Sequence, residues 1–252
     1  MQNIKSLPSE FIPNRYGMHL NNLFHFFSGR FGEELSDNLF KLYKVGTSKF
    51  WINDGGRAAV FPFIDYWGNF REAKIVAYNP YTGKRIKKGE PAMIETKCGY
   101  ITDLTSDKVW MSGNYMIKDR KAVLEPCFFG EHLLSDAKNV AIVESERSAL
   151  IASIYLPKFT WLATGGKNGC KWMDENVFQV LSGKDVTLFP RIGSYNDWNQ
   201  VRGKMSKYGI EVKTSDYLES IATAKEKEKR LDIADFLLRA DHENADFDFL
   251  MP

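Results

Sequence analysis

Residues 139–145 read NVAIVES, and residues 146–156 read ERSALIASIYL. The first run is an apolar strand that ends in the acid Glu144, and the second has the pattern of a helix. Further strand-like runs follow at 159–166 (FTWLATGG), 185–190 (DVTLFP) and 210–216 (IEVKTSD), with helical patterns between them at 171–183 and 197–209. This alternation predicts an α/β fold, a parallel sheet with helices on both faces.

The carboxyl ends of the predicted strands carry the residues of chemical interest. Right-handed crossovers bring these ends to one rim, where open α/β sheets bind their ligands. Here the rim collects Glu144, Gly165, Gly166 and Arg191. Arg191 is the unexpected member, because it places a cation just past the third strand, in the run TLFPRIG (187–193).

The chain before this sheet does not show the regular alternation of strands and helices. The runs AAVFPFID (58–65) and FREAKIVAYN (70–79) predict strands joined by a hairpin, since the Gly and Asn of YWGN tolerate positive φ. We therefore predict an α+β N-terminal domain over 1–125, with an aromatic core and a basic hairpin, a sheet domain over 126–240, and an acidic tail over 241–252.

A basic cluster marks the turn after the second of these strands, in GKRIKKG. Four cations at a hairpin tip can displace counterions from nucleic acid, and neighbouring aromatic residues can stack on bases. The alternative is a solvated turn beside aromatic residues that pack in the core. The cluster consists of Lys84, Arg85, Lys87 and Lys88.

The composition limits the classes of function. The chain has 252 residues, 44% of them hydrophobic, and a formal net charge of +2, so no strong global field indicates a polyanionic partner. Its three cysteines are far apart and form no C-x-x-C pair, which argues against a zinc ribbon or a disulfide framework. No apolar run approaches the ~20 residues of a membrane span. We expect a cytoplasmic protein without a membrane partner.

The second half resembles a Toprim domain, from about Val140 to Leu238. The pieces that carry the resemblance are AIVESE (141–146), LATGG (162–166), TLFPRIG (187–193) and DIADFLL (232–238). The whole chain is similar to primase-like proteins of bacterial mobile genetic elements. That similarity rests on KVGTSKF (44–50), the run from Val60 to Lys87, and CFFGEHLL (127–134).

The resemblance implies a site in which Glu144 acts as general acid/base and a D-x-D motif after the third strand holds a metal ion. The two acidic positions are Arg191 and Gly193 here, so the motif is degenerate. Asp197 is the nearest carboxylate. The resemblance also implies supporting roles for Gly165, Gly166, Asp232 and Asp235. Relatives carry an N-terminal zinc-binding segment, whereas no Cys or His cluster precedes residue 98 here.

These residues support one leading hypothesis and two alternatives. In the first, Arg191 replaces the metal, either by pairing with Glu144 or by binding a phosphate, and the protein is primase-related and binds single-stranded or duplex nucleic acid without a cofactor. In the second, Glu144, Asp197 and Asp232 or Asp235 hold Mg²⁺ in an active nuclease or primase fragment. In the third, the chain is an interaction module for replication or mobilisation proteins. Whether it is an enzyme stays open.

Overall fold

The computed structural model describes residues 18–48, 57–87, 92–96, 99–101, 108–110, 124–240 and 242. Lys88, Cys98 and, apart from His242, the predicted acidic tail lie outside them. By its internal contacts the chain divides into two units. One comprises Met1–Phe63 and Asn69–Glu125, and the other comprises Ile64–Gly68 and Pro126–Pro252.

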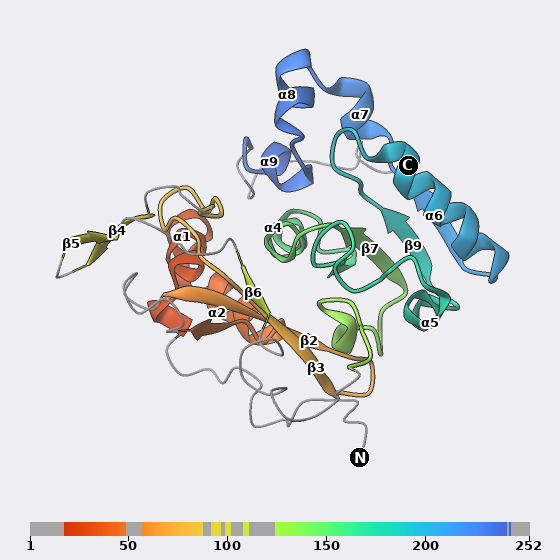
Figure 1. Cartoon of the computed structure of the whole chain (residues 1–252), viewed down its shortest axis with the longest axis horizontal. Helices are drawn as coiled ribbons and strands as arrows, with labels where there is room; N and C mark the ends of the chain where they lie inside the picture. Colours follow the sequence, from red (N-terminus) through yellow and green to blue (C-terminus); the bar gives the residue numbers. More distant parts are fainter. Residues whose placement is uncertain are drawn as a thin grey trace. The chain divides into compact units, whose positions relative to one another are not determined.

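The first unit combines helices with antiparallel strands (Figure 1). Its described helices are η2 (Met18–Leu20), α1 (Asn22–Phe31) and α2 (Glu33–Leu42). One sheet has the order β1-β2-β3-β6, and a separate pair is formed by β4 and β5. The strands are β1 (Gly46–Ser48), β2 (Ala58–Ile64), β3 (Phe70–Val76), β4 (Ala92–Thr96), β5 (Gly99–Ile101) and β6 (Val109–Trp110).

A side-chain cap and a glycine explain where α1 begins and where it ends. The side chain of Asn21 accepts hydrogen bonds from the amides of Leu23 and Phe24, which satisfies the exposed N–H groups at the start of α1. Gly32, with φ of 87°, separates the two helices at a conformation that favours glycine. Phe27 and Phe40 then meet edge to face, with ring centroids 5.3 Å apart, in the core of this unit.

The second unit is built on a parallel sheet with the strand order β10-β9-β7-β8. Its strands are β7 (Asn139–Val143), β8 (Thr160–Ala163), β9 (Asp185–Leu188) and β10 (Glu211–Thr214). Its described helices are η4 (Glu131–Leu133), α4 (Glu146–Tyr155), α5 (Glu175–Phe178), η5 (Gln179–Leu181), α6 (Tyr195–Lys207), α7 (Tyr217–Ile221), α8 (Ala224–Lys229) and α9 (Ile233–Leu237).

Burial of β7 on both faces accounts for the unbroken apolar run Val140–Val143. Val140 to Val143 are all almost fully buried, as expected for an inner parallel strand. In register, Val140 lies beside Thr160 of β8 and Val186 of β9. Figure 1 shows α4 and α9 on one side of this sheet and α5 and α6 on the other. The predicted α/β fold, a parallel sheet with helices on both faces, is confirmed.

The strand order creates a switch point between β7 and β9. From β7 the chain moves outward to β8, and it then returns to the opposite side of β7 to form β9 and β10. In open α/β sheets, ligands bind in the crevice beyond the carboxyl ends of the two strands that flank such a reversal. A ligand site is therefore expected at the residues that follow β7 and β9.

One predicted helix is much shorter than expected. The pattern at 171–183 predicts a continuous helix, but only α5 and the 3-10 turn η5 form there. Lys171 adopts a positive φ of 53°, which is incompatible with a helix start at this point. The ring of Trp172 instead packs on Trp198 of α6, with centroids 4.5 Å apart, so tertiary burial outweighs the local pattern.

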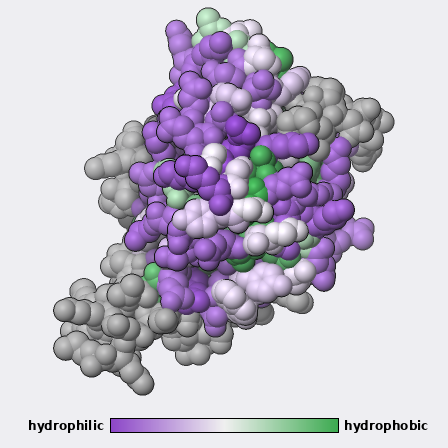
Figure 2. All heavy atoms as spheres, turned by 90° about the vertical axis from the view of Figure 1, so that its right-hand side faces the viewer, coloured by the Kyte–Doolittle hydropathy of each residue, from purple (hydrophilic) through white to green (hydrophobic). Residues whose placement is uncertain are grey.

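None of the described helices is both long and apolar enough to cross a bilayer. Figure 2 shows a face on which hydrophilic residues predominate and hydrophobic residues appear only in small groups.

Candidate functional site

Glu144 and Arg191 lie in contact at the switch point of the sheet. Glu144 directly follows β7, and Arg191 lies three residues beyond β9. The amide of Phe189 donates to the carbonyl of Ile142 at 2.9 Å, which continues the pairing of the two strands toward the rim. Arg191 Nε lies 3.1 Å from Glu144 Oε2. The structure therefore brings together the two residues that the sequence predicted for one rim, while their role stays a prediction.

The pair retains capacity for a further ligand. The side chain of Arg191 is 28% exposed and that of Glu144 is 19% exposed. The N–H of Arg191 Nε is not aligned for a hydrogen bond, so the contact is an ion pair. At ~4 Å near a protein surface such charges attract by about 4 kcal/mol before desolvation and side-chain entropy are subtracted. A guanidinium has five N–H donors, and one carboxylate oxygen cannot engage them all.

The loop after β8 fixes the backbone of Glu144. The amide of Gly166 donates to the carbonyl of Glu144 at 2.9 Å, with Gly166 at a φ of 128°. The loop closes tightly, because a Cβ at Gly169 would lie 2.2 Å from the carbonyl oxygen of Thr164. The predicted supporting glycines, Gly165 and Gly166, thus lie in a turn that is hydrogen-bonded to the residue they were expected to support.

A second arginine approaches Gly193, the other position that the resemblance assigns to an acid. A Cβ at Gly193 would lie 3.9 Å from Nε and 4.0 Å from Nη2 of Arg230. The Gly193 amide donates to Glu219 Oε2 at 2.7 Å, and the Ile192 amide donates to the carbonyl of Leu231 at 3.0 Å. The loop that carries Arg191 is therefore held by α7 and the turn after α8. Both positions that the resemblance assigns to acids have a guanidinium beside them.

Arg230 is a rim residue that sequence reasoning missed. It ends the charged run TAKEKEKR, whose composition indicates a solvated helix or linker. The structure agrees that α8 has no buried residue, but Arg230 adopts a left-handed φ of 51° at its end. That conformation turns the chain back toward the rim. Nothing in the sequence alone signals which cation of the run does so.

The carboxylate of Asp197 lies in the first turn of α6 and pairs with a different side chain. Lys167 Nζ lies 3.3 Å from Asp197 Oδ2, and both side chains are largely exposed. An exposed pair of this kind contributes little to stability. Asp197 is thus engaged by Lys167, whereas Glu144 is engaged by Arg191.

The predicted acids Asp232 and Asp235 hold α9 onto α4. Asp232 caps α9 in a reciprocal capping box with Asp235. The hydroxyl of Ser148 donates to Asp232 Oδ2, and Arg147 Nη1 lies 3.9 Å from Asp235 Oδ1. Ser148 also contacts Ser145, the N-cap of α4 and the neighbour of Glu144. These acids therefore connect to the rim through the start of α4.

The residues at the rim do not fit a divalent metal ion. Mg²⁺ prefers one or two carboxylates with open space for waters and phosphate. Glu144 instead faces a guanidinium, and a cation placed there would be repelled by Arg191 and Arg230. In the part of the chain that the structure describes, no three His, Cys, Asp or Glu side chains are grouped so that they could hold a metal ion.

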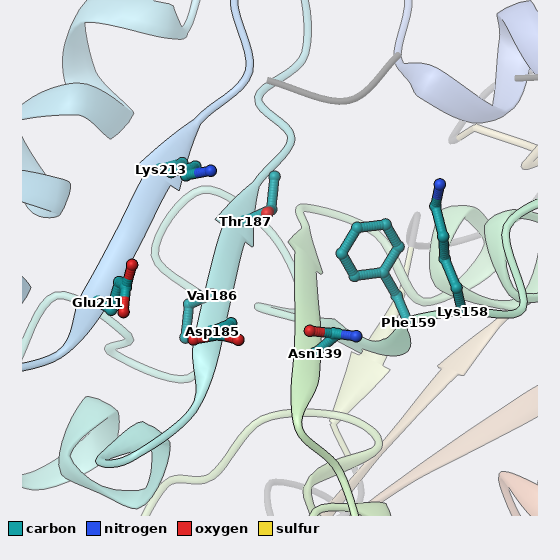
Figure 3. A pocket seen from close by; sticks show the side chains of 8 residues that line it. All are labelled: Asn139, Lys158, Phe159, Asp185, Val186, Thr187, Glu211 and Lys213. Atoms are coloured by element: carbon teal, nitrogen blue, oxygen red, sulfur yellow. The ribbon is translucent and has the colours of Figure 1, made fainter. Parts of the chain in front are cut away.

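A pocket lies at the opposite edge of the same sheet (Figure 3). It has a volume of about 370 Å³ and is lined at the amino ends of the strands by Asn139, Asp185 and Glu211. The side chains of Lys158 and Lys213 balance the charge of the two acids. This pocket therefore has no clear preference for an anion, and it does not coincide with the rim.

Burial raises the pKa of Asp232, the nearby charge of Asp235 raises it further, and Arg147 opposes both. Because the pKa of Asp232 is higher in the folded state, ionised Asp232 lowers the free energy of unfolding. This loss of stability grows as pH rises from the pKa of an Asp in the unfolded chain, about 4, through the pKa of Asp232 in the folded protein. We expect Asp232→Asn to gain stability relative to the wild type across that window and to stay level above it. Denaturant unfolding at successive pH values measures this difference. Asp197→Asn is the exposed control. The prediction would be contradicted if the stability of Asp232→Asn ran parallel to that of the wild type at every pH.

The comparisons with known proteins give one family and several distant structures. Residues 21–192 match the model of a family described as "Domain of unknown function (DUF6371)". None of the curated proteins is significantly similar in sequence. The primase fragment of the bacteriophage T7 primase-helicase is 10% identical, with a TM-score of 0.48 over 91% of this chain and 82% of that one. The Escherichia coli primase catalytic core is 11% identical, with a TM-score of 0.43 over 89% and 78%. TM-scores below 0.5 do not by themselves establish a shared fold.

Proposed function

Since the chain belongs to the family described as a domain of unknown function (DUF6371), we propose a function from its own residues. It is a primase-related protein of a mobile element that binds nucleic acid in the cytoplasm. Its rim binds a backbone phosphate through Arg191, in the place where a Toprim site would hold a metal ion. It needs no cofactor for this binding. Replication or mobilisation proteins are its expected protein partners.

The observation that carries the proposal is the position of Arg191. It lies at the switch point of the sheet, next to Glu144, with the guanidinium of Arg230 approaching the neighbouring Gly193. Ligands of open α/β sheets bind at this point. A planar guanidinium suits a phosphate because it can donate two parallel hydrogen bonds. Two guanidinium groups at one rim favour an anionic ligand over a cationic one.

The same observation weighs against an active metal-dependent enzyme. Phosphoryl transfer of this type depends on metal ions that neutralise charge on the phosphate. The carboxylates that could rebuild the ligand set are engaged elsewhere, Asp197 with Lys167 and Asp232 with Ser148. Binding without catalysis is the function that these contacts support best.

Arg191→Ala tests the proposal directly. A charge-assisted hydrogen bond contributes about 1.5–3 kcal/mol, so we expect affinity for DNA to fall about tenfold or more. Glu144→Gln should have the opposite sign, because it removes the anion that competes with phosphate for Arg191. Fluorescence anisotropy with labelled single-stranded and duplex DNA at several salt concentrations measures both changes.

The matched control is Arg202→Ala, which removes an exposed arginine from the middle of α6. It lowers the net charge by the same amount as Arg191→Ala without altering the rim. Equal effects of the two substitutions would show that only net charge matters, and the assignment of a phosphate site to the rim would then be wrong. Weaker DNA binding by Glu144→Gln would also contradict the phosphate site. That result would mean that the ion pair is purely structural, because such a pair is lost when either partner is removed.

A further inference from the structure

The turn at residues 79–85 of the first unit is fixed by its own hydrogen bonds. Asn79 Oδ1 accepts from the amides of Tyr81 and Thr82, both at 2.9 Å, and forms an Asx turn. The Asn79 amide donates to the carbonyl of Lys84, and the Gly83 amide donates to the carbonyl of Asn79, again at 2.9 Å. The backbone of this turn therefore has a defined conformation before any ligand binds.

Packing against α1 fixes the turn further. Gly83 is buried and has a φ of 61°, and a Cβ there would lie 2.5 Å from the ring of Phe26. Only glycine fits this conformation and this approach without displacing the ring. Just after the turn, Ile86 is buried and its amide donates to the carbonyl of Ala77 at 2.9 Å. The turn is thus attached to the core of its unit at Gly83 and at Ile86.

Its side chains point outward and combine an aromatic ring with cations. Tyr81 is 68% exposed, which is unusual for so large an aromatic residue. Its ring meets that of His25 of α1 edge to face, with centroids 6.1 Å apart, which restricts its orientation. Lys84, Arg85 and Lys87 are also exposed, within six residues of Tyr81.

We propose that this turn binds single-stranded nucleic acid, with a base stacked on Tyr81 and backbone phosphates held by Lys84, Arg85 and Lys87. The inference rests on the proposed function in that both take nucleic acid as the ligand. Aromatic side chains in a cationic groove are the general means of binding single strands, because every unpaired base has a free face. In a duplex those faces are covered by neighbouring base pairs. A fixed turn also loses little conformational entropy on binding.

The test compares two ligands, a single-stranded oligonucleotide and a duplex of the same length. Stacking on one aromatic residue changes affinity by about tenfold, so Tyr81→Ala should weaken single-strand binding by about that factor. Duplex binding should change far less. Tyr81→Phe, which keeps the ring, should bind as the wild type does, whereas Tyr81→Leu should behave like Tyr81→Ala. Thermal unfolding checks that each variant is folded.

A second measurement reports on stacking itself. A single strand that contains 2-aminopurine should lose fluorescence when its base stacks on Tyr81, and this quenching should vanish in Tyr81→Leu. Tyr208→Ala, which removes another exposed tyrosine from the second unit, is the control and should change neither readout.

The outcomes separate this inference from the proposed function. If Arg191→Ala weakens binding while Tyr81→Leu leaves single-strand affinity and quenching unchanged, the turn is not a stacking site although the rim still binds phosphate. If Tyr81→Leu weakens duplex and single-strand binding equally, the preference for single strands is wrong. If the wild type binds neither ligand, both proposals fail.

Discussion

Arg191→Asp should create a site for a divalent metal ion that the wild type lacks. The substitution removes one positive charge and adds one negative charge at a position whose side chain lies 3.1 Å from Glu144. Two carboxylates at the switch point would then resemble the minimal ligand set of Mg²⁺. Mn²⁺ is the better first probe, because it binds oxygen and nitrogen ligands more tightly and tolerates imperfect geometry. Titration calorimetry with Mn²⁺ should detect binding only in the variant.

Three controls make the result specific. Arg191→Asn removes the cation without adding a carboxylate and should bind Mn²⁺ much more weakly than Arg191→Asp. Glu144→Gln added to Arg191→Asp should abolish the new site. Arg230→Ala added to it should strengthen the site, since a guanidinium beside Gly193 repels the ion. The contrary result would be tight Mn²⁺ binding by the wild type that Glu144→Gln removes, and the chain would then be better interpreted as an active enzyme.

The rim itself could be predicted from the sequence because it depends on local patterns. An apolar run that ends in Glu144 and another that ends before Arg191 each specify a strand, and parallel pairing then brings the two ends together. No long-range information beyond the handedness of the crossovers is needed. The contact between the two side chains follows from that topology.

Arg230 could not be predicted in the same way. Its approach to Gly193 depends on the route of α7 and α8 after the last strand and on the hydrogen bond from Ile192 to Leu231. Those contacts join segments about forty residues apart, and nothing in their composition specifies them. The same holds for the bond of Asp232 to Ser148, which docks α9 onto α4. Tertiary hydrogen bonds decide both cases.

The exposed turn shows another limit of sequence patterns. The cluster at Lys84, Arg85 and Lys87 is visible as a basic run, but Tyr81 looks like any aromatic residue of an aromatic-rich region. Gly83 packs closely against Phe26, and the ring of Tyr81 meets only the edge of the α1 surface at His25, so most of the ring stays exposed. Exposure of a single side chain in a tight turn therefore requires the structure.

Replacing Lys84, Arg85 and Lys87 together by alanine should make nucleic-acid binding less dependent on salt. Each phosphate neutralised on a single strand contributes about 0.7 to the slope of log affinity against log salt, so loss of three contacts should flatten it by about 2 units. The affinity lost should be largest at low salt, where released counterions contribute most. Anisotropy titrations of wild type and variant at several salt concentrations give the two slopes.

The matched control replaces Arg202, Lys204 and Lys207, three exposed cations of α6, by alanine. Both triple variants lower the formal net charge by three units, so they share any effect of the overall field. Only direct phosphate contacts at the turn can make their slopes differ. Equal slopes in the two variants would mean that the basic turn is a solvated hairpin. If the variant at the turn has a flatter salt dependence but still quenches 2-aminopurine, the cations contact the phosphate backbone and Tyr81 contacts the base independently of them.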